Sequence, residues 1–197
     1  MSKKKLALLV NIAILLLELY VLGRNIFVDH TVAVEYYTND SNIIAMISSL
    51  LFIIFYKKEK EFVKDIRYIA TCCLTVTILV VILILCPMYD FNYKLLMFTD
   101  NFLILHTIVP ILCIISYVFF EERSKKDYIC IVFTVTYSIV ILVLNIFSIV
   151  DGPYPFLKVN PNDIFMTIIW GIAIMVGNYL IGIGLNTLNK KLKGAKQ

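Results

Sequence analysis

Charged residues are scarce in this chain. They make up 16% of its 197 positions, whereas hydrophobic residues make up 60%. A soluble domain with one core carries a larger share of charged residues and a smaller share of apolar ones. The composition therefore excludes such a domain and predicts an integral membrane protein.

The chain also lacks any linker rich in glycine or serine, and it has no internal repeat. Long apolar runs fill most of it, and each can cross about 30 Å of hydrocarbon as a helix. The connections between these runs are too short for a soluble domain. We therefore predict one domain, residues 1–197, folded as an all-α bundle of six transmembrane helices. The predicted spans are Leu6–Val28, Glu35–Tyr56, Ile69–Pro87, Leu96–Phe120, Tyr128–Val150 and Ile164–Leu188.

The first run has no clear small-residue cleavage site, so we expect it to stay as a span. Lys and Arg in the short loops predict the orientation. With the N-terminus in the cytoplasm, 15 of the 18 basic residues lie on that side, and only Arg24, Lys94 and Lys158 lie near the outer side. Both termini are therefore expected to be cytoplasmic. The net charge of +4 reflects this topology, and we predict no nucleic-acid partner.

Cysteines with the spacing of a zinc site or a disulfide framework are absent. The five cysteines lie within or at the ends of the predicted spans, where a thiol in apolar surroundings is inert. We expect them to be packing residues, and we predict no metal and no cofactor. They are Cys72, Cys73, Cys86, Cys113 and Cys130.

Polar residues are few within the spans, and each one is costly in hydrocarbon. His106 is the only histidine in a hydrophobic run, and Pro110 follows it by four residues. A proline at that spacing removes the hydrogen bond to the carbonyl of residue 106. Because a reactive side chain then lies beside a loosened backbone, His106 is the first candidate for chemistry.

In the first span, Asn11, Glu18 and Asn25 recur every seven residues and share one face. Glu18 is expected about 18 Å from the cytoplasmic end, and His106 about 15 Å in from the outer end of its span. The two depths are comparable, so Glu18 is a candidate to accept the imidazole N–H and fix its tautomer. The alternative is a Glu18 that is neutral or paired with Arg24 or another polar group.

The second span opens with a polar segment. Thr38, Ser41 and Asn42 share one helix face and descend toward the expected depth of the histidine. A hydroxyl and a general base are therefore expected to be neighbours. The alternative is an ordinary helix start, with Thr38 or Asn39 capping the first turn and Asp40 favoured by the helix dipole.

The last outer connection contains three prolines and one glycine in Asp151–Pro161, so it cannot be a continuous helix. Tyr154, Phe156 and Leu157 are apolar enough to fold over the mouth of the bundle. We predict that Tyr154, Pro155 and Phe156 form a lid. A rigid interfacial turn with an aromatic anchor is the alternative.

Three motifs occur in one order along the chain: an aromatic pair followed by Thr-x-x-Ser-Asn at 36–42, His-x-x-x-Pro at 106–110, and Tyr-Pro-Phe-Leu at 154–157. Together they resemble the androgen-induced protein family, which includes the androgen-dependent regulator of tissue factor pathway inhibitor and bacterial relatives of six spans. The resemblance covers essentially the whole chain. It implies a threonine hydrolase in a bacterial plasma membrane that cleaves esters of fatty acids with hydroxy fatty acids, with Thr38 as nucleophile and His106 as base.

The residue types fit that chemistry. A threonine hydroxyl is a weak nucleophile, so it needs a base such as His106 to take its proton as it attacks the ester carbonyl. The imidazole then returns the proton to the leaving alcohol. Ser41 or Asn42 are candidates to donate hydrogen bonds to the developing oxyanion. The expected partners are membrane lipids or lipid-like substrates.

Two other function classes stay open. One is the substrate-binding membrane subunit of a vitamin transporter, although its usual Ala-x-x-x-Ala pattern is absent because Ala7 and Ala13 are six residues apart. The other is a structural or regulatory membrane protein with the same fold. An intramembrane protease fits poorly, because there is no Gly-x-Ser-x-Gly motif and Glu121-Glu122-Arg123 lacks metal-site spacing.

Overall fold

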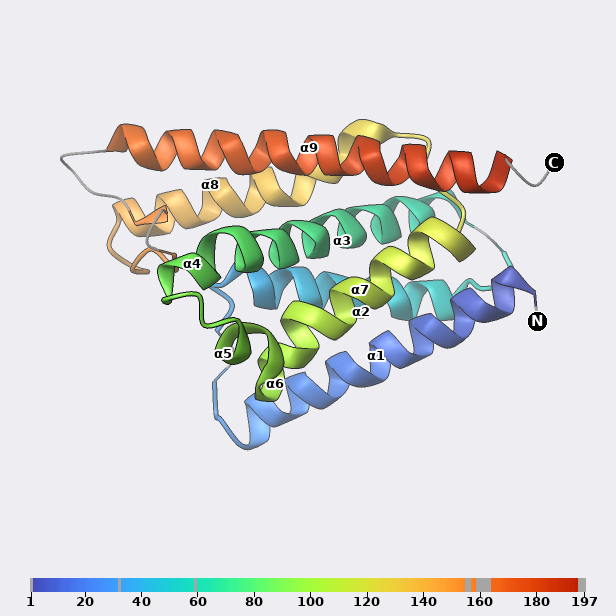
Figure 1. Ribbon diagram of the computed structural model, residues 1–197, viewed down its shortest axis with the longest axis horizontal. Helices are drawn as coiled ribbons and strands as arrows, with labels where there is room; N and C mark the ends of the chain where they lie inside the picture. The colour runs from blue at the N-terminus through green and yellow to red at the C-terminus, as the bar shows by residue number, and fades with distance from the viewer. Residues whose placement is uncertain (1, 32, 59, 155–156, 159–163, 195–197) are drawn as a thin grey trace.

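Six long helices run side by side, and no residue that the structure describes forms a strand (Figure 1). The computed structural model describes residues 2–31, 33–58, 60–154, 157–158 and 164–194. The all-α prediction is confirmed, and each of the six helices is long and apolar enough to cross a membrane. They cover Lys3–Phe27, Tyr37–Ile54, Glu61–Met88, Asp100–Phe120, Asp127–Ile146 and Phe165–Lys193.

Several of these six helices are composite. Along the described chain, η1, η2 and η3 are π-helical turns and η4 is a 3-10 turn. The elements in order are α1 (Lys3–Phe27), α2 (Tyr37–Ile54), α3 (Glu61–Val80), η1 (Val81–Leu85), α4 (Cys86–Met88), α5 (Tyr93–Phe98), α6 (Asp100–Phe102), η2 (Leu103–Ile108), α7 (Val109–Ile115), η3 (Ser116–Phe120), η4 (Asp127–Ile131), α8 (Val132–Ile146) and α9 (Ile164–Gly194).

Helix α3 lies at the centre of the bundle and contacts α2, α7, α8 and α9. In the most apolar stretch of the long helix Glu61–Met88, which α3 begins, 56% of the residues are buried, against 17–44% in the corresponding stretches of the other five helices. Both chain termini lie at one end of the bundle, which we call the terminal end (Figure 1). The connections α1–α2, α4–α5 and α8–α9 lie at the opposite end, which we call the loop end.

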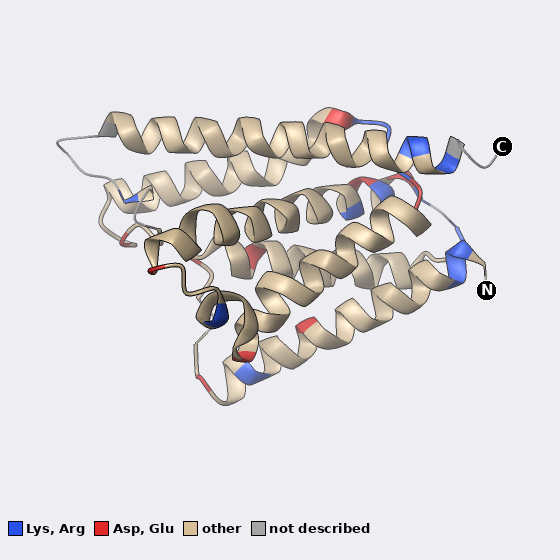
Figure 2. Ribbon diagram, in the orientation of Figure 1, with Lys and Arg blue, Asp and Glu red and all other residues tan. Residues whose placement is uncertain are grey.

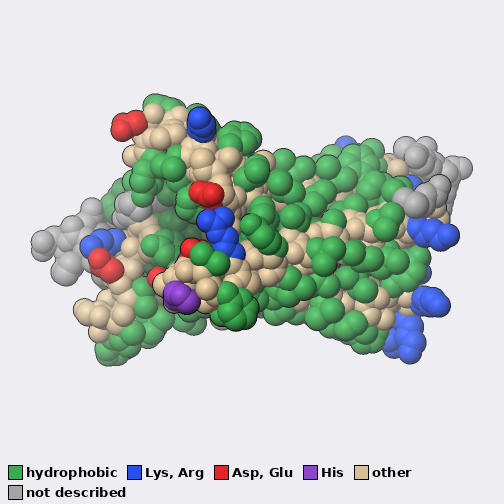
Figure 3. Space-filling view, turned by 90° about the horizontal axis from the view of Figure 1, so that it is seen from below, with side chains coloured by type: hydrophobic (Ala, Val, Ile, Leu, Met, Phe, Trp, Pro, Cys, Tyr) green, Lys and Arg blue, Asp and Glu red, His purple; other side chains and the backbone are tan. Residues whose placement is uncertain are grey.

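Charge is distributed unequally between the two ends. Lys and Arg side chains gather at the terminal end, and Arg24, Lys94 and Lys158 belong to the loop end (Figure 2). Between the ends, hydrophobic side chains cover the flank of the bundle (Figure 3). An apolar belt between two polar ends is the surface that a bilayer-spanning protein presents to lipid.

The interior contains three clusters of buried apolar side chains. All five cysteines are free and buried in them, which agrees with a packing role. Helix α9 approaches this interior closely at Gly182, where an added Cβ would lie 2.5 Å from the Tyr68 hydroxyl and 2.7 Å from Cys130 Sγ. Only glycine at this position allows α9 to pack this closely against α3 and η4.

The third helix begins earlier than the sequence indicated. It starts at Glu61 rather than at Ile69, and Arg67, which the predicted spans leave in the cytoplasmic connection between residues 56 and 69, is buried in it. The charged residues that made this segment resemble a loop form the first two turns of α3. A buried guanidinium is tolerated there because an acidic partner, Glu121, neutralises it.

The predicted fourth span is also interrupted. α5 is a separate short helix, the chain is extended at Thr99, and Asp100 then starts the long helix with a φ of 43°. His106 therefore lies six residues, or about 9 Å, from the start of its span, rather than about 15 Å. The fifth helix differs in length only, since α8 ends at Ile146.

Each of the two prolines within the long helices, Pro87 and Pro110, follows a π-helical turn, η1 and η2 respectively. A proline has no N–H to donate, and its ring crowds the carbonyl four residues earlier, so the preceding turn widens. After η2, the Val109 N–H donates to the carbonyl of Ile104, five residues back. The loosened backbone that Pro110 predicted around His106 is therefore present as a π-helical turn.

Candidate functional site

Thr38 lies in the first turn of α2 with 8% of its surface exposed. The N-cap position belongs to Tyr36, and no side chain caps this helix. The Asn39 amide donates instead to the carbonyl of Ala33 at 2.7 Å. The alternative in which Thr38 or Asn39 caps the helix is therefore not what the structure contains.

Ser41 and Asn42 hold the start of α2 in place. The Ser41 hydroxyl donates to the carbonyl of Thr38 at 2.9 Å and lies 3.0 Å from the Thr77 hydroxyl. The Asn42 amide donates to the carbonyls of Thr38 and Leu105 at 2.7 and 3.3 Å. Since the amide has two hydrogens, both are used. In this geometry Asn42 fastens Thr38 to the residue before His106, and its oxyanion role stays a prediction.

His106 is oriented by a backbone carbonyl. Its ring is stacked on Phe102, with centroids 5.0 Å apart, and Nδ1 lies 2.6 Å from the Leu96 carbonyl oxygen. A carbonyl can only accept, so Nδ1 carries the proton and the neutral ring keeps a lone pair on Nε2. A second bond, from the Thr107 hydroxyl to the Met97 carbonyl at 2.8 Å, also fastens α5 to η2.

Glu18 is buried on α1 and lines a small cavity of about 20 Å³ together with Asn42 and Leu105. Its Oε1 has no hydrogen-bond partner among the described residues. The imidazole N–H that we expected Glu18 to accept is directed at the Leu96 carbonyl, and no hydrogen bond among the described residues joins Glu18 to His106. Orientation of the imidazole by Glu18 therefore stays a prediction.

Arg24, the alternative partner of Glu18, points elsewhere. Its guanidinium lies 3.8 Å from the Asp100 carboxylate and 3.4 Å from the Asn101 side-chain oxygen. The Asn101 amide in turn donates to Asn25 at 3.0 Å. These contacts join the loop end of α1 to α6, so the face shared by Asn25 and Glu18 points into the bundle as the seven-residue spacing predicted.

Tyr154 of the α8–α9 connection lies directly over Thr38. Its hydroxyl oxygen is 3.4 Å from both the Thr38 hydroxyl and the Thr38 backbone N. The ring is buried and makes an edge-to-face contact with Tyr36. Burial raises the pKa of Tyr154, so the phenol stays protonated at neutral pH. Pro155 and Phe156, the other two predicted lid residues, lie outside the described residues.

Thr38 lines a cavity of about 30 Å³ between α2, α3, η1, α8, α9 and the Tyr154 segment. An apolar groove of about 150 Å³ between α8 and α9 adjoins it, and Ser138 and Leu157 line both. An apolar groove that shares part of its wall with the cavity of a buried hydroxyl offers room for an acyl chain. His106 is not among the residues that line the Thr38 cavity.

Through Asn42 the structure thus links the Thr38 backbone to that of Leu105, the residue before His106, while the Thr38 and His106 side chains have different partners. Among the described residues, no hydrogen bond joins the Thr38 hydroxyl to the imidazole. No group of three or more His, Cys, Asp or Glu side chains among the described residues is arranged to hold a metal ion.

Sequence reasoning missed a second polar site at the terminal end. Arg67 makes a two-pronged contact with Glu121, with N–O distances of 2.8 and 2.9 Å. Ser116 and Asn11 donate to the same carboxylate at 2.5 and 2.9 Å. Both charged side chains are almost fully buried. The arginine near the start of an apolar run was the only available indication.

Comparison of the chain with family models, with curated proteins and with solved structures finds no match in any of the three.

Proposed function

We propose that this chain is a hydrolase of lipid esters inserted in a bacterial plasma membrane, with Thr38 as nucleophile and His106 as general base. Both termini lie in the cytoplasm in this proposal, because Lys and Arg are concentrated at the terminal end. The loop end and Thr38 then lie toward the outer leaflet. The resemblance to the androgen-induced protein family supplies the substrate class, an ester of a fatty acid with a hydroxy fatty acid.

One contact carries the proposal: the hydrogen bond between His106 Nδ1 and the Leu96 carbonyl. It fixes the neutral tautomer in which Nε2 is the proton acceptor, which is the form that a general base needs. A histidine that only filled space in an apolar core would be a costly choice, since its second nitrogen also needs a partner.

The hydrogen bond between Thr38 and Tyr154 explains how substrate would enter. Its length of 3.4 Å is well above the usual value of about 2.7–2.8 Å for two hydroxyls, so the contact is weak and easily exchanged. A substrate carbonyl would replace it, with its acyl chain along the α8–α9 groove. Tyr154 would then donate to the carbonyl oxygen as negative charge develops there.

In the reaction that we propose, the Thr38 oxygen forms a bond to the ester carbon while its proton passes to His106 Nε2. Collapse of the tetrahedral intermediate breaks the ester bond, and the imidazolium protonates the leaving alcohol. A water molecule, deprotonated by the same nitrogen, then attacks the acyl carbon, the bond between that carbon and the Thr38 oxygen breaks to release the fatty acid, and the imidazolium returns the proton to Thr38. Bound substrate brings hydroxyl and imidazole within reach, as catalytic contacts often tighten only in the complex.

The test is hydrolysis of a fatty acid ester of a hydroxy fatty acid by purified protein in detergent, followed by product release. Thr38→Ala should abolish turnover, and His106→Ala should lower it by about 10²–10⁴-fold. Thr136→Ala, which removes an exposed hydroxyl of α8, is the matched control and should keep the full rate. Full activity of Thr38→Ala would refute the proposal.

A further inference from the structure

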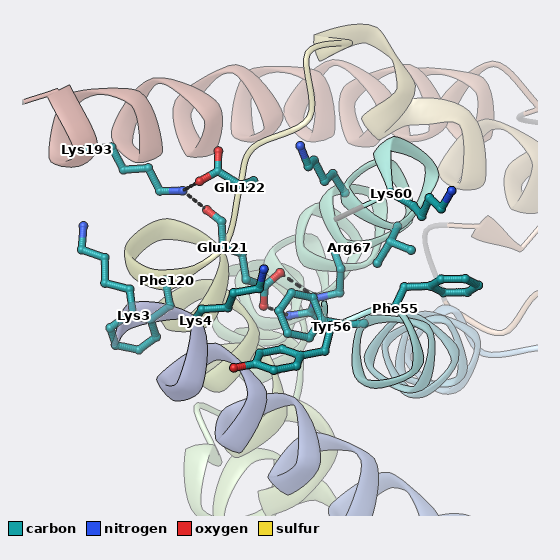
Figure 4. A pocket seen from close by; sticks show the side chains of 13 residues that line it. Lys3, Lys4, Phe55, Tyr56, Lys60, Arg67, Phe120, Glu121, Glu122 and Lys193 are labelled. Atoms are coloured by element: carbon teal, nitrogen blue, oxygen red, sulfur yellow. Dashed lines mark hydrogen bonds and ion pairs between the residues drawn. The ribbon is translucent and has the colours of Figure 1, made fainter. Parts of the chain in front are cut away.

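A cavity of about 320 Å³ opens at the terminal end of the bundle (Figure 4). The end of α2 lines it, whereas Thr38 lies in the first turn of α2. The first turns of α1 and α3, the end of α2, the connection after η3 and the last turn of α9 line it. Its volume falls within the range of about 300–1,000 Å³ that is typical of small-ligand pockets. Six cationic side chains line it: Lys3, Lys4, Lys60, Lys64, Arg67 and Lys193.

The floor of this cavity is the ion pair of Arg67 and Glu121, seen at the centre of Figure 4. Burial alone would raise the pKa of Glu121, but the guanidinium and hydrogen bonds from Ser116 and Asn11 hold that pKa below its usual value. The pair is therefore ionised and neutral as a whole. It supplies a fixed polar floor and adds no net charge.

The rim carries positive charge that acidic side chains only partly offset. Lys193 lies 2.9 Å from Glu122, and its amine also donates to the Glu121 carbonyl. Lys64 lies 2.9 Å from Glu61. By contrast, neither Lys3 nor Lys60 forms an ion pair with a described acidic residue. Positive charge thus exceeds negative charge around the opening.

Two helix N-termini add to this excess. α1 begins with three lysines and has no acidic residue in its first turn, although the helix dipole favours the opposite sign there. α3 begins after Lys60, and no side chain caps its first N–H groups. Helix N-termini with uncapped N–H groups are favourable places for an anion. The uncapped N-terminus of α3 borders this cavity, whereas the Ser2 hydroxyl accepts a hydrogen bond from the Lys5 N–H and caps α1.

The walls between these charges are aromatic and apolar. Phe52, Phe55 and Phe120 line the cavity, and Tyr56 makes a cation–π contact with Lys4 whose amine lies 5.6 Å from the ring centroid. A pocket that is cationic at its rim and apolar at its walls matches a ligand with an anionic head and an apolar body.

We propose that this cavity binds a phosphate-bearing anion, with the phosphate among the lysines and the uncapped N-terminus of α3. Phosphate oxygens accept several charge-assisted hydrogen bonds at once, which suits clustered ammonium and backbone N–H donors. The phosphate group belongs to an anionic phospholipid of the surrounding leaflet or to a small phosphate ester in solution. The inference does not depend on catalysis at Thr38.

Native mass spectrometry of the purified full chain in detergent tests this inference. Phosphatidylglycerol is titrated against phosphatidylcholine, and the Kd of each is measured for two double variants. Lys3→Gln with Lys60→Gln removes two charges from the cavity rim. Lys57→Gln with Lys58→Gln removes two exposed charges from the same end that do not line the cavity, and it is the matched control.

We expect phosphatidylglycerol to bind more tightly than phosphatidylcholine, and the rim variant to bind it about tenfold more weakly. The control should change the Kd by less than about twofold. Displacement of the lipid by inorganic phosphate, compared with chloride at equal ionic strength, would support a soluble phosphate ester; retention would support the lipid. An equal loss of phosphatidylglycerol affinity in both double variants, or no preference for the anionic lipid, would overturn the inference. Either result would indicate that the lipid binds only through the general positive charge of this surface.

Discussion

At the scale of single residues, the chemistry of the candidate site depends on which donor and acceptor atoms already form hydrogen bonds. The Leu96 carbonyl takes one nitrogen of His106 and leaves the other as an acceptor. The donors of Ser41 and Asn42 are satisfied by backbone carbonyls, so they hold the start of α2. The phenol of Tyr154 lies within hydrogen-bond distance of the Thr38 hydroxyl, which makes it the better candidate for oxyanion stabilisation.

Removal of that donor should impair the reaction without changing the fold. Tyr154→Phe keeps the buried ring and deletes only the hydroxyl, so we expect kcat to fall by about 10²-fold, as when one oxyanion donor is lost. Steady-state hydrolysis of the lipid ester measures this. Tyr128→Phe, at an exposed tyrosine of η4, is the control. An unchanged kcat in Tyr154→Phe would assign the residue to packing alone.

At the scale of elements, the buried pair of Arg67 and Glu121 ties α3 to the end of η3. Loss of one partner leaves an uncompensated charge in the interior, which costs about 3–5 kcal/mol, whereas loss of both costs much less. Thermal unfolding in detergent should therefore show Arg67→Met and Glu121→Gln each less stable than the double variant.

An exposed ion pair provides the comparison for the Arg67 and Glu121 variants. Lys158 lies 2.9 Å from Asp151, and both side chains are mostly exposed. Lys158→Met should change the stability by less than about 0.5 kcal/mol. If single variants of Arg67 or Glu121 unfold at the same temperature as the unchanged protein, the buried pair contributes nothing to holding these elements together.

Most of the helices could be predicted from the sequence, because the length and hydropathy of a membrane-spanning helix are properties of local composition. All six helices and the effect of Pro110 on the turn around His106 were predicted. The break at Thr99 was not, since the apolar residues before it continue the pattern of a long helix. Arg67 was assigned to a loop because its neutralising partner is 54 residues away in the chain.

The site was predictable to a similar extent. Motif spacing selected Thr38, His106 and Tyr154, and the structure places Tyr154 against Thr38. The acceptor for His106 Nδ1 is a backbone carbonyl, and every residue has one, so no residue type could point to Leu96. Contacts of this kind depend on tertiary structure alone.

At the scale of the whole molecule, the unequal distribution of Lys and Arg predicts the orientation. Reporter fusions placed at Lys94 and at the C-terminus should lie on opposite sides of the membrane, with the C-terminus in the cytoplasm. A fusion after Lys125, in the connection between η3 and η4, should report the same side as the C-terminus. A cytoplasmic signal at Lys94 would refute this topology and the outer-leaflet placement of Thr38.

The central claim, that Thr38 is a nucleophile activated by His106, is tested most directly by locating a covalent adduct. The purified protein is treated with a fluorophosphonate probe, digested and mapped by mass spectrometry. We predict that the added mass lies on Thr38, is retained in Thr136→Ala, and is lost in His106→Ala although that variant stays folded. An adduct on another residue, or labelling of Thr38 that is unchanged in His106→Ala, would contradict the account.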